Sequence, residues 1–222
     1  LYAWKDWFKA VCGLVLLMAV VEHPDMPKNI LGVQGLNPWN LLMADILLAW
    51  ALTRPREGLV WDLPRHVAVL LLLYFGVVLV SFLRLLADPQ RLEPYTAAGL
   101  GSEYIINCVK WVLPGLLLYD GCRTTGRLRL AVGCIVGLYL LLALQVIRYI
   151  PPSAAMSGSD VDHIAYKLVK NEIGYSRVNM STLLSGASWA MLAAVPLAKR
   201  RWQVLLAFAL FALIAYAQAL TG

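Results

Sequence analysis

The sequence predicts an all-α integral membrane protein, a polytopic bundle of about seven transmembrane helices with a short amphipathic helix on the periplasmic side. Of the 222 residues, 60% are hydrophobic and only 14% are charged, whereas soluble domains carry roughly 25% charged residues. The mean hydropathy is +0.69. The apolar residues are also gathered into runs that approach the roughly 20 residues needed to cross a bilayer as a helix. A membrane protein is therefore the expected class.

The apolar runs set the order of the predicted spans. The first run is short, but Trp7 and Phe8 extend it toward the membrane interface. A signal peptide is the alternative for this run, but Glu22-His23-Pro24 follows it instead of the small residues of a cleavage site. We predict a single transmembrane domain over residues 1–222, with spans at residues 7–21, 38–52, 67–87, 104–119, 130–149, 180–198 and 202–220 and a periplasmic segment at residues 159–173.

Local signals mark the ends of several spans. Pro24, Pro27 and Pro38 prevent one long helix over residues 22–37. Pro38 suits a first helical turn, with Asn37 as its cap. The sixth span is rich in Ser, Gly and Ala, which permits close helix packing.

Lysine and arginine are unequally divided between the two ends of these spans. The richer side holds eleven of them: Lys5, Lys9, Arg54, Arg56, Arg65, Arg123, Arg127, Arg129, Lys199, Arg200 and Arg201. The other side holds seven: Lys28, Arg84, Arg91, Arg148, Lys167, Lys170 and Arg177. Because cytoplasmic loops carry the excess of positive residues, we predict a cytoplasmic N-terminus and a periplasmic location for residues 159–179. The expected location is the bacterial inner membrane, crossed several times.

The periplasmic segment has the periodicity of an amphipathic helix. Its apolar residues fall on one helix face: Val161, Ile164, Ala165, Leu168 and Val169. Ser159 and Asp162 fit the start of a capping box, and Gly174 is the expected stop. Such a helix lies along the membrane surface with Lys167 and Lys170 toward water or headgroups. It either gathers an anionic substrate or is a surface connector with solvated lysines.

Arginines at the same predicted level strengthen the first interpretation. Arg177 and Asn179 directly precede the sixth span, and the planar fork of an arginine matches phosphate oxygens. Arg84 and Arg148 approach the same boundary. The alternative is that these arginines anchor helix ends or snorkel to the interface. The predicted substrate-binding residues are Arg177, Asn179, Arg84, Arg148, Lys167 and Lys170.

Two charges fall deep inside predicted spans. Asp45 lies about seven residues after Pro38, and Lys110 about six residues after Tyr104, so their depths agree within about one turn at ~1.5 Å per residue. Charges at membrane depth are costly unless they are paired or hydrated. We therefore predict an intramembrane charge pair of Asp45 and Lys110, more as a structural pair than as catalytic machinery.

Other kinds of site are not indicated. The four cysteines show no CxxC spacing and the three histidines are far apart, so neither a metal site nor a disulfide framework is expected. The net charge of +6 is spread in short clusters beside apolar runs, which is typical of membrane topology and not of nucleic-acid binding.

The run IGYSRVNMSTLLSGASWAMLAAVPL, followed by a basic turn and a span ending in ALTG, resembles the O-antigen ligase and polymerase superfamily. Gly174, Arg177, Asn179, Pro196 and Thr221-Gly222 occupy the places of the family pattern, with two departures. The order of Gly174 and Arg177 is reversed relative to the usual pattern, and Val178 stands where a proline is common. The stretch NPWNLL after the first span is similar to the exosortase-associated branch. The resemblance covers the N-terminal half of such a protein, so the chain is expected to be part of a longer one.

The resemblance implies a membrane glycosyltransferase that needs no metal, no cofactor and no nucleotide sugar. It would move a glycan from undecaprenyl pyrophosphate to a glycan, lipid or protein acceptor on the periplasmic side, with catalytic residues expected beyond Gly222. Family arginines bind the pyrophosphate, which implies that role for Arg177. Two alternatives stay open: a non-enzymatic scaffold or assembly subunit that docks membrane-protein partners, and a transporter or flippase for lipid-linked sugars.

Overall fold

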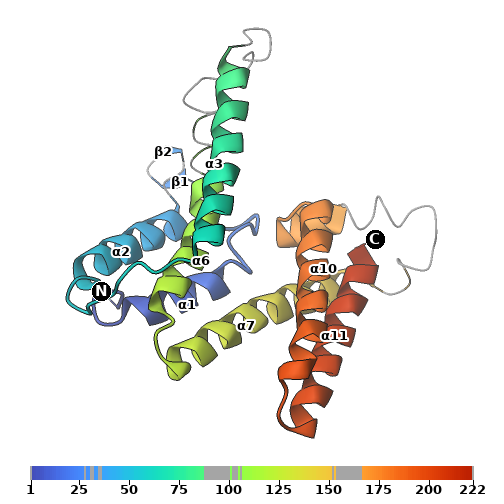
Figure 1. The fold of residues 1–222 in the computed structure, drawn as a ribbon. Helices are drawn as coiled ribbons and strands as arrows, with labels where there is room; N and C mark the ends of the chain where they lie inside the picture. The colour runs from blue at the N-terminus through green and yellow to red at the C-terminus, as the bar shows by residue number, and fades with distance from the viewer. Residues whose placement is uncertain are drawn as a thin grey trace. The chain divides into compact units, whose positions relative to one another are not determined.

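The computed structural model of the protein describes residues 2–27, 29–30, 33–34, 37–87, 101, 105, 107–151, 153 and 167–221. Over these residues the fold is all-α apart from one antiparallel pair of two-residue strands, in which Asn29 faces Gln34. The elements in Figure 1 are α1 (Trp7–Leu17), β1 (Asn29–Ile30), β2 (Val33–Gln34), α2 (Pro38–Thr53), α3 (Arg65–Leu86), α6 (Asn107–Gly121), α7 (Thr125–Tyr149), η2 (Val169–Ile173), α10 (Arg177–Ala194), η3 (Val195–Leu197) and α11 (Arg201–Thr221). The predicted helical class is confirmed.

Local sequence signals explain where two of these elements begin and end. Pro38 is the first residue of α2, and the side-chain oxygen of Asn37 accepts a hydrogen bond of 2.8 Å from the backbone N–H of Asn40. This bond satisfies one of the free N–H groups at the helix start. Gly174 ends η2 in the left-handed conformation, and its N–H donates to the carbonyl of Val169 at 2.9 Å. The predicted cap and the predicted stop are both confirmed.

A helix lies in each of the seven predicted apolar ranges, but several boundaries differ. Helix α1 ends at Leu17, and tighter turns continue the chain. Helix α7 begins at Thr125 because the hydroxyl of Thr124 caps it, accepting from the N–H of Arg127 at 3.2 Å. Helix α10 begins at Arg177, three residues before the predicted start. Of the predicted segment at residues 159–173, residues 159–166 lie outside the described part of the chain.

Among the residues that the structure describes, three helices are long enough and apolar enough to cross a membrane: α3, α7 and α11. At a rise of about 1.5 Å per residue, the 22 residues of α3 extend ~33 Å, close to the thickness of a bilayer core. No residue of α3 is buried, and Leu72 is 70% exposed. Helices α1 and α2 are apolar but shorter. The sequence and the structure thus agree on apolar membrane-type helices, with three of spanning length.

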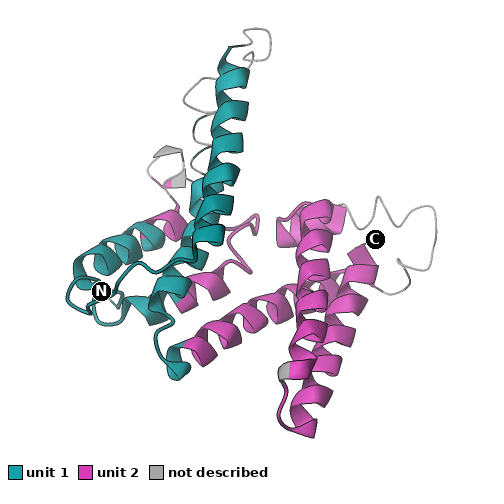
Figure 2. Ribbon diagram, in the orientation of Figure 1, with its two compact units in different colours: residues 1–11, 42–127 teal, residues 12–41, 128–222 magenta. Residues whose placement is uncertain are grey.

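The described residues pack into two units, shown in Figure 2: Leu1–Val11 with Leu42–Arg127, and Cys12–Leu41 with Leu128–Gly222. The core of unit 1 includes Trp7, Phe8, Ile46, Ala49 and Leu117, all buried. The core of unit 2 includes Leu142, Val146, Ile173, Met180, Leu184 and Ile214. In unit 2, α10 and α11 pack along each other (Figure 1).

Candidate functional site

The start of α10 is held by two interactions of different kinds. The hydroxyl of Ser176 accepts a hydrogen bond of 3.2 Å from the N–H of Asn179, which is an ordinary N-terminal cap. The guanidinium Nε of Arg177 donates to the backbone carbonyl of Thr221 at 2.5 Å. The hydroxyl of Thr221 in turn donates to the carbonyl of Gln218 at 2.7 Å, and Thr221 is fully buried. The first turn of α10 is therefore tied to the last turn of α11.

Helix dipoles explain why the side chain of Arg177 bonds to the C-terminal end of α11. A cation is unfavourable at a helix N-terminus and favourable at a C-terminus, where the last carbonyls lack partners. Arg177 begins α10, yet its Nε reaches the C-terminal carbonyl of α11. Val178, the next residue, is 72% exposed, and Asn179 is also exposed. The half-buried Arg177 thus lies beside a polar, accessible helix end.

The segment before α10 is fixed to the turn that follows α1. The hydroxyl of Tyr175 donates to the carbonyl of Met18 at 2.6 Å. A side chain at Gly174 would place its Cβ 1.6 Å from the carbonyl oxygen of Glu22, so only glycine fits there. Burial, together with the negative charge of Glu22, raises the pKa of Tyr175 well above its usual value. Tyr175 therefore stays protonated and keeps donating at neutral pH.

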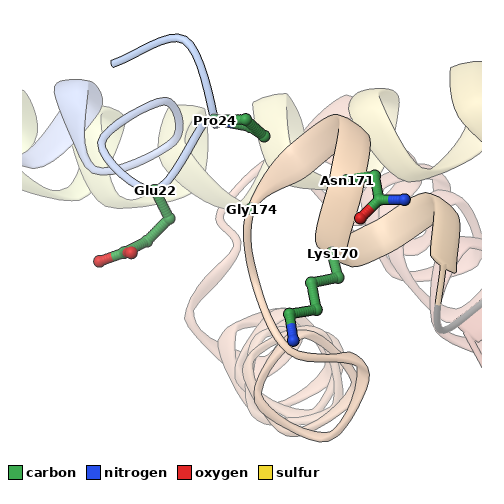
Figure 3. Close-up of a pocket in the computed structure, with 5 residues that line it drawn as sticks. All are labelled: Glu22, Pro24, Lys170, Asn171 and Gly174. Carbon is green, nitrogen blue, oxygen red and sulfur yellow. The ribbon is translucent and has the colours of Figure 1, made fainter. Parts of the chain in front are cut away.

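This packing creates an open hollow of about 450 Å³ beside η2, shown in Figure 3. Glu22 and Pro24 line it from the turn after α1, and Lys170, Asn171 and Gly174 line it from η2 and its cap. The buried side of η2 is formed by Val169 and Ile173, which places Lys170 and Asn171 on the exposed side. Lys167 is exposed as well.

Arg148 and Arg84 occupy the last turns of their helices. Arg148 lies in the last turn of α7 and over the ring of Tyr149, with 5.5 Å between its Cζ and the ring centroid. Arg84 lies in the last turn of α3. Both positions favour a cation because of the helix dipole. Arg84 belongs to unit 1, whereas Arg148, Lys167, Lys170, Arg177 and Asn179 belong to unit 2. A common site for all six residues stays a prediction.

Asp45 and Lys110 lie in unit 1, each with an aromatic neighbour. Asp45 accepts a hydrogen bond of 2.8 Å from the indole N–H of Trp4. The ammonium of Lys110 lies 5.4 Å from the ring centroid of Trp111. Trp4 precedes α1 and is partly exposed, so Asp45 gains a donor that the sequence did not indicate. The charge pair of Asp45 and Lys110 stays a prediction.

The structure also contains a buried carboxylate that sequence reasoning missed. Asp120, in the last turn of α6, is fully buried. It accepts from the indole of Trp50 at 2.8 Å, from Nε of Arg54 at 2.9 Å and from a terminal nitrogen of Arg123 at 3.3 Å. The cation of Arg54 also lies 5.8 Å from the rings of Trp50 and Trp61. We call Trp50, Arg54, Trp61, Asp62, Asp120 and Arg123 the Asp120 cluster.

Arg123 connects this buried acid to an exposed one. Its two terminal nitrogens lie 2.5 and 2.9 Å from the carboxylate oxygens of Asp62. The hydrogen bonds from Arg123 lower the pKa of Asp62, and the same bonds raise the pKa of Arg123. The only sequence signal was that Asp120 and Arg123 follow the fourth apolar run. The cluster joins acids, arginines and tryptophans to one another, so its arrangement is suited to holding loops together.

In the described ranges, no group of three or more His, Cys, Asp or Glu side chains lies close enough together to hold a metal ion. Comparison of the chain with protein-family models, curated proteins and solved structures finds no match. The proposed function therefore rests on the contacts of the described residues and on the family pattern that the sequence resembles.

Proposed function

We propose that the protein is a membrane glycan ligase-like or polymerase-like enzyme that takes a glycan from an undecaprenyl-pyrophosphate donor. The acceptor lies on the periplasmic face. The main support for the proposal is the hydrogen bond from Arg177 to Thr221. The family pattern combines an arginine before one span with a Thr-Gly at the end of the next. These two parts are 44 residues apart in the chain, and the bond brings them together at one end of the α10–α11 pair.

The proposal includes seven spans with a cytoplasmic N-terminus in the bacterial inner membrane. Three helices of spanning length support it, as does the wholly unburied apolar surface of α3, which lipid would cover. The remaining helices α1, α2, α6 and α10 cross the bilayer in this proposal with their flanking turns. The start of α10 and the end of α11 then share the periplasmic boundary.

The chemistry requires positive charge at the leaving group. An acceptor hydroxyl forms a bond to the anomeric carbon of the donor sugar while the bond from that carbon to the pyrophosphate oxygen breaks. The bonding electrons leave with the pyrophosphate, and the hydroxyl proton passes to a general base. Preorganised cations stabilise the charge that develops on the leaving group. Arg177 supplies this charge, with Lys167 in the same unit.

A scaffold or assembly subunit is the second candidate, and α3 is the observation that favours it. An apolar helix with every residue at least partly exposed can bind partner helices as well as lipid. The scaffold does not require Arg177 to bind a diphosphate. A lipid-binding experiment therefore separates the two functions.

The test is binding of undecaprenyl pyrophosphate to the full chain in nanodiscs, counted by native mass spectrometry. Losing a charge-assisted contact of about 1.5–3 kcal/mol weakens binding about tenfold or more. We expect this loss in Arg177→Ala and in Arg177→Gln, which keeps a donor for Thr221 but removes the charge. Arg201→Ala is the matched control, because Arg201 begins α11 at the opposite end of that helix. Equal binding by the wild type and both Arg177 variants would contradict the proposal.

A further inference from the structure

The hollow beside η2 differs in charge from the start of α10. Its described lining residues supply one carboxylate, one ammonium and one amide, from Glu22, Lys170 and Asn171. The carboxylate of Glu22 would repel a phosphate group. These three side chains therefore do not favour a diphosphate as the ligand. The formal charges of Glu22 and Lys170 cancel within the described part of the lining, whereas Arg177 carries a positive charge.

The chemistry of these groups suits a polyhydroxylated ligand. A carboxylate accepts hydrogen bonds from two hydroxyls, an amide both donates and accepts, and an ammonium only donates. A sugar hydroxyl both donates and accepts, so it can pair with each of them. The ring of Pro24 adds an apolar surface for the C–H face of a sugar ring. A volume of about 450 Å³ lies within the roughly 300–1,000 Å³ of small-molecule sites.

The walls of the hollow are held in place by packing. The missing side chain of Gly174 lets the backbone of Glu22 approach, and the bond from Tyr175 to Met18 fixes the same two segments together. Val169 and Ile173 are buried, which anchors η2 and orients Lys170 and Asn171. In Figure 3, Gly174 lies between Glu22 on one side and Lys170 and Asn171 on the other. Preorganised walls reduce the entropic cost of binding a ligand.

We propose that the hollow lined by Glu22, Pro24, Lys170, Asn171 and Gly174 is a sugar-binding subsite. The inference rests on the proposed function, because it assigns to this site a sugar unit of the transferred or accepting glycan. Glu22 and Asn171 bind ring hydroxyls, and Lys170 donates to a third. The subsite is distinct from the pyrophosphate contact proposed for Arg177.

The experiment uses the full chain in nanodiscs of phosphatidylethanolamine and phosphatidylglycerol, assembled from cholate so that no glycoside detergent competes. Saturation-transfer NMR is recorded with glucose, galactose and N-acetylglucosamine, and with alanine as a zwitterion and methyl phosphate as an anion, all of which carry C–H protons. We expect saturation transfer to at least one sugar. Glu22→Ala and Asn171→Ala reduce it at least about fivefold, because each removes hydrogen bonds to hydroxyls.

The controls are Asp25→Ala and Glu172→Ala, which remove exposed acids next to the hollow and leave sugar transfer within about twofold. Glu22→Gln, which preserves size, is measured in case Glu22→Ala fails to fold. The subsite is excluded if no sugar shows transfer, if alanine or methyl phosphate shows the larger Glu22-dependent signal, or if the control variants lose as much signal. Undecaprenyl pyrophosphate binding in the same discs separates the two proposals. If it persists without sugar binding, only the subsite fails; if it is absent while sugar binds, the proposed function fails.

Discussion

Arg177 and Thr221 are joined by a hydrogen bond of 2.5 Å from the guanidinium Nε to the backbone carbonyl. The bond connects the N-terminus of α10 to the C-terminus of α11, where each helix end leaves backbone groups without intrahelical partners. Arg177 is therefore structural as well as a proposed ligand for diphosphate. The two roles are separable because the bond uses Nε.

Arg177→Ala is expected to lower the free energy of unfolding of the α10–α11 pair by about 1.5–3 kcal/mol, the usual value of a hydrogen bond to a charged group. Arg177→Gln retains an N–H donor and should lose less. Thermal unfolding in nanodiscs, followed by circular dichroism, measures the difference. Identical melting temperatures for the wild type and Arg177→Ala would show that the bond does not stabilise the pair.

Gly174→Ala should destabilise unit 2 severely. The glycine has φ of 92°, and a Cβ would lie 1.6 Å from the carbonyl oxygen of Glu22, a backbone atom that cannot rotate away. We expect a loss of at least about 2 kcal/mol. Gly186→Ala is the matched control, because a Cβ added there would meet no atom within 4 Å and alanine favours a helix by about 0.5–1 kcal/mol. Thermal unfolding measures the stability of both variants. Equal stability of Gly174→Ala and Gly186→Ala would contradict the close approach of the backbone at Gly174.

The free energy of unfolding should fall at alkaline pH because Tyr175 loses its proton. Its pKa is raised in the folded protein, so the folded state holds the proton more tightly than the unfolded state. The stabilisation is complete below the unfolded value of 10.0 and is lost progressively as pH rises above it. Tyr175→Phe loses a hydrogen bond of about 0.5–1.5 kcal/mol at neutral pH but should decline less steeply above pH 10.0. Melting temperatures from about pH 7 to about pH 11 test this; parallel curves for the two proteins would contradict it.

Asp120→Ala should destabilise unit 1. Removing the acid leaves the cations of Arg54 and Arg123 and the indole of Trp50 without their shared acceptor. We expect a loss of about 2–4 kcal/mol, below that of a fully buried pair because both arginines are partly exposed. Asp62→Ala, which removes an exposed partner of Arg123, should cost much less. Chemical denaturation monitored by tryptophan fluorescence measures the free energy of unfolding of the two variants. Equal losses of stability in Asp120→Ala and Asp62→Ala would show that the burial of Asp120 adds nothing to its contribution.

Local signals in the sequence predicted much of the helical order. Asn37 and Pro38 set the start of α2, Gly174 ends η2, and apolar runs mark every long helix. Each of these signals acts within a few residues of its effect. Boundaries that depend on a cap outside the apolar run, such as Thr124 before α7, were placed several residues away.

The tertiary contacts were not predictable in the same way. Asp120 is bound by Trp50 and Arg54, 70 and 66 residues away in the chain. Of these residues, the sequence pattern singled out only Arg54, as one of the positive charges on the side predicted to be cytoplasmic. Tyr175 reaches Met18 across 157 residues. A single sequence carries no signal for such pairs, because any acid can pair with several cations.

The proposed contact between Arg177 and a lipid-borne diphosphate can be tested by photo-crosslinking. The full chain in nanodiscs is irradiated with a diazirine analogue of undecaprenyl pyrophosphate that carries the label beside the diphosphate. We expect mass spectrometry to find crosslinked peptides from residues 167–180, excess undecaprenyl pyrophosphate to prevent the crosslink, and Arg177→Gln to reduce it about tenfold. Crosslinks confined to α3, unaffected by competitor or by Arg177→Gln, would contradict this contact and the function proposed from it.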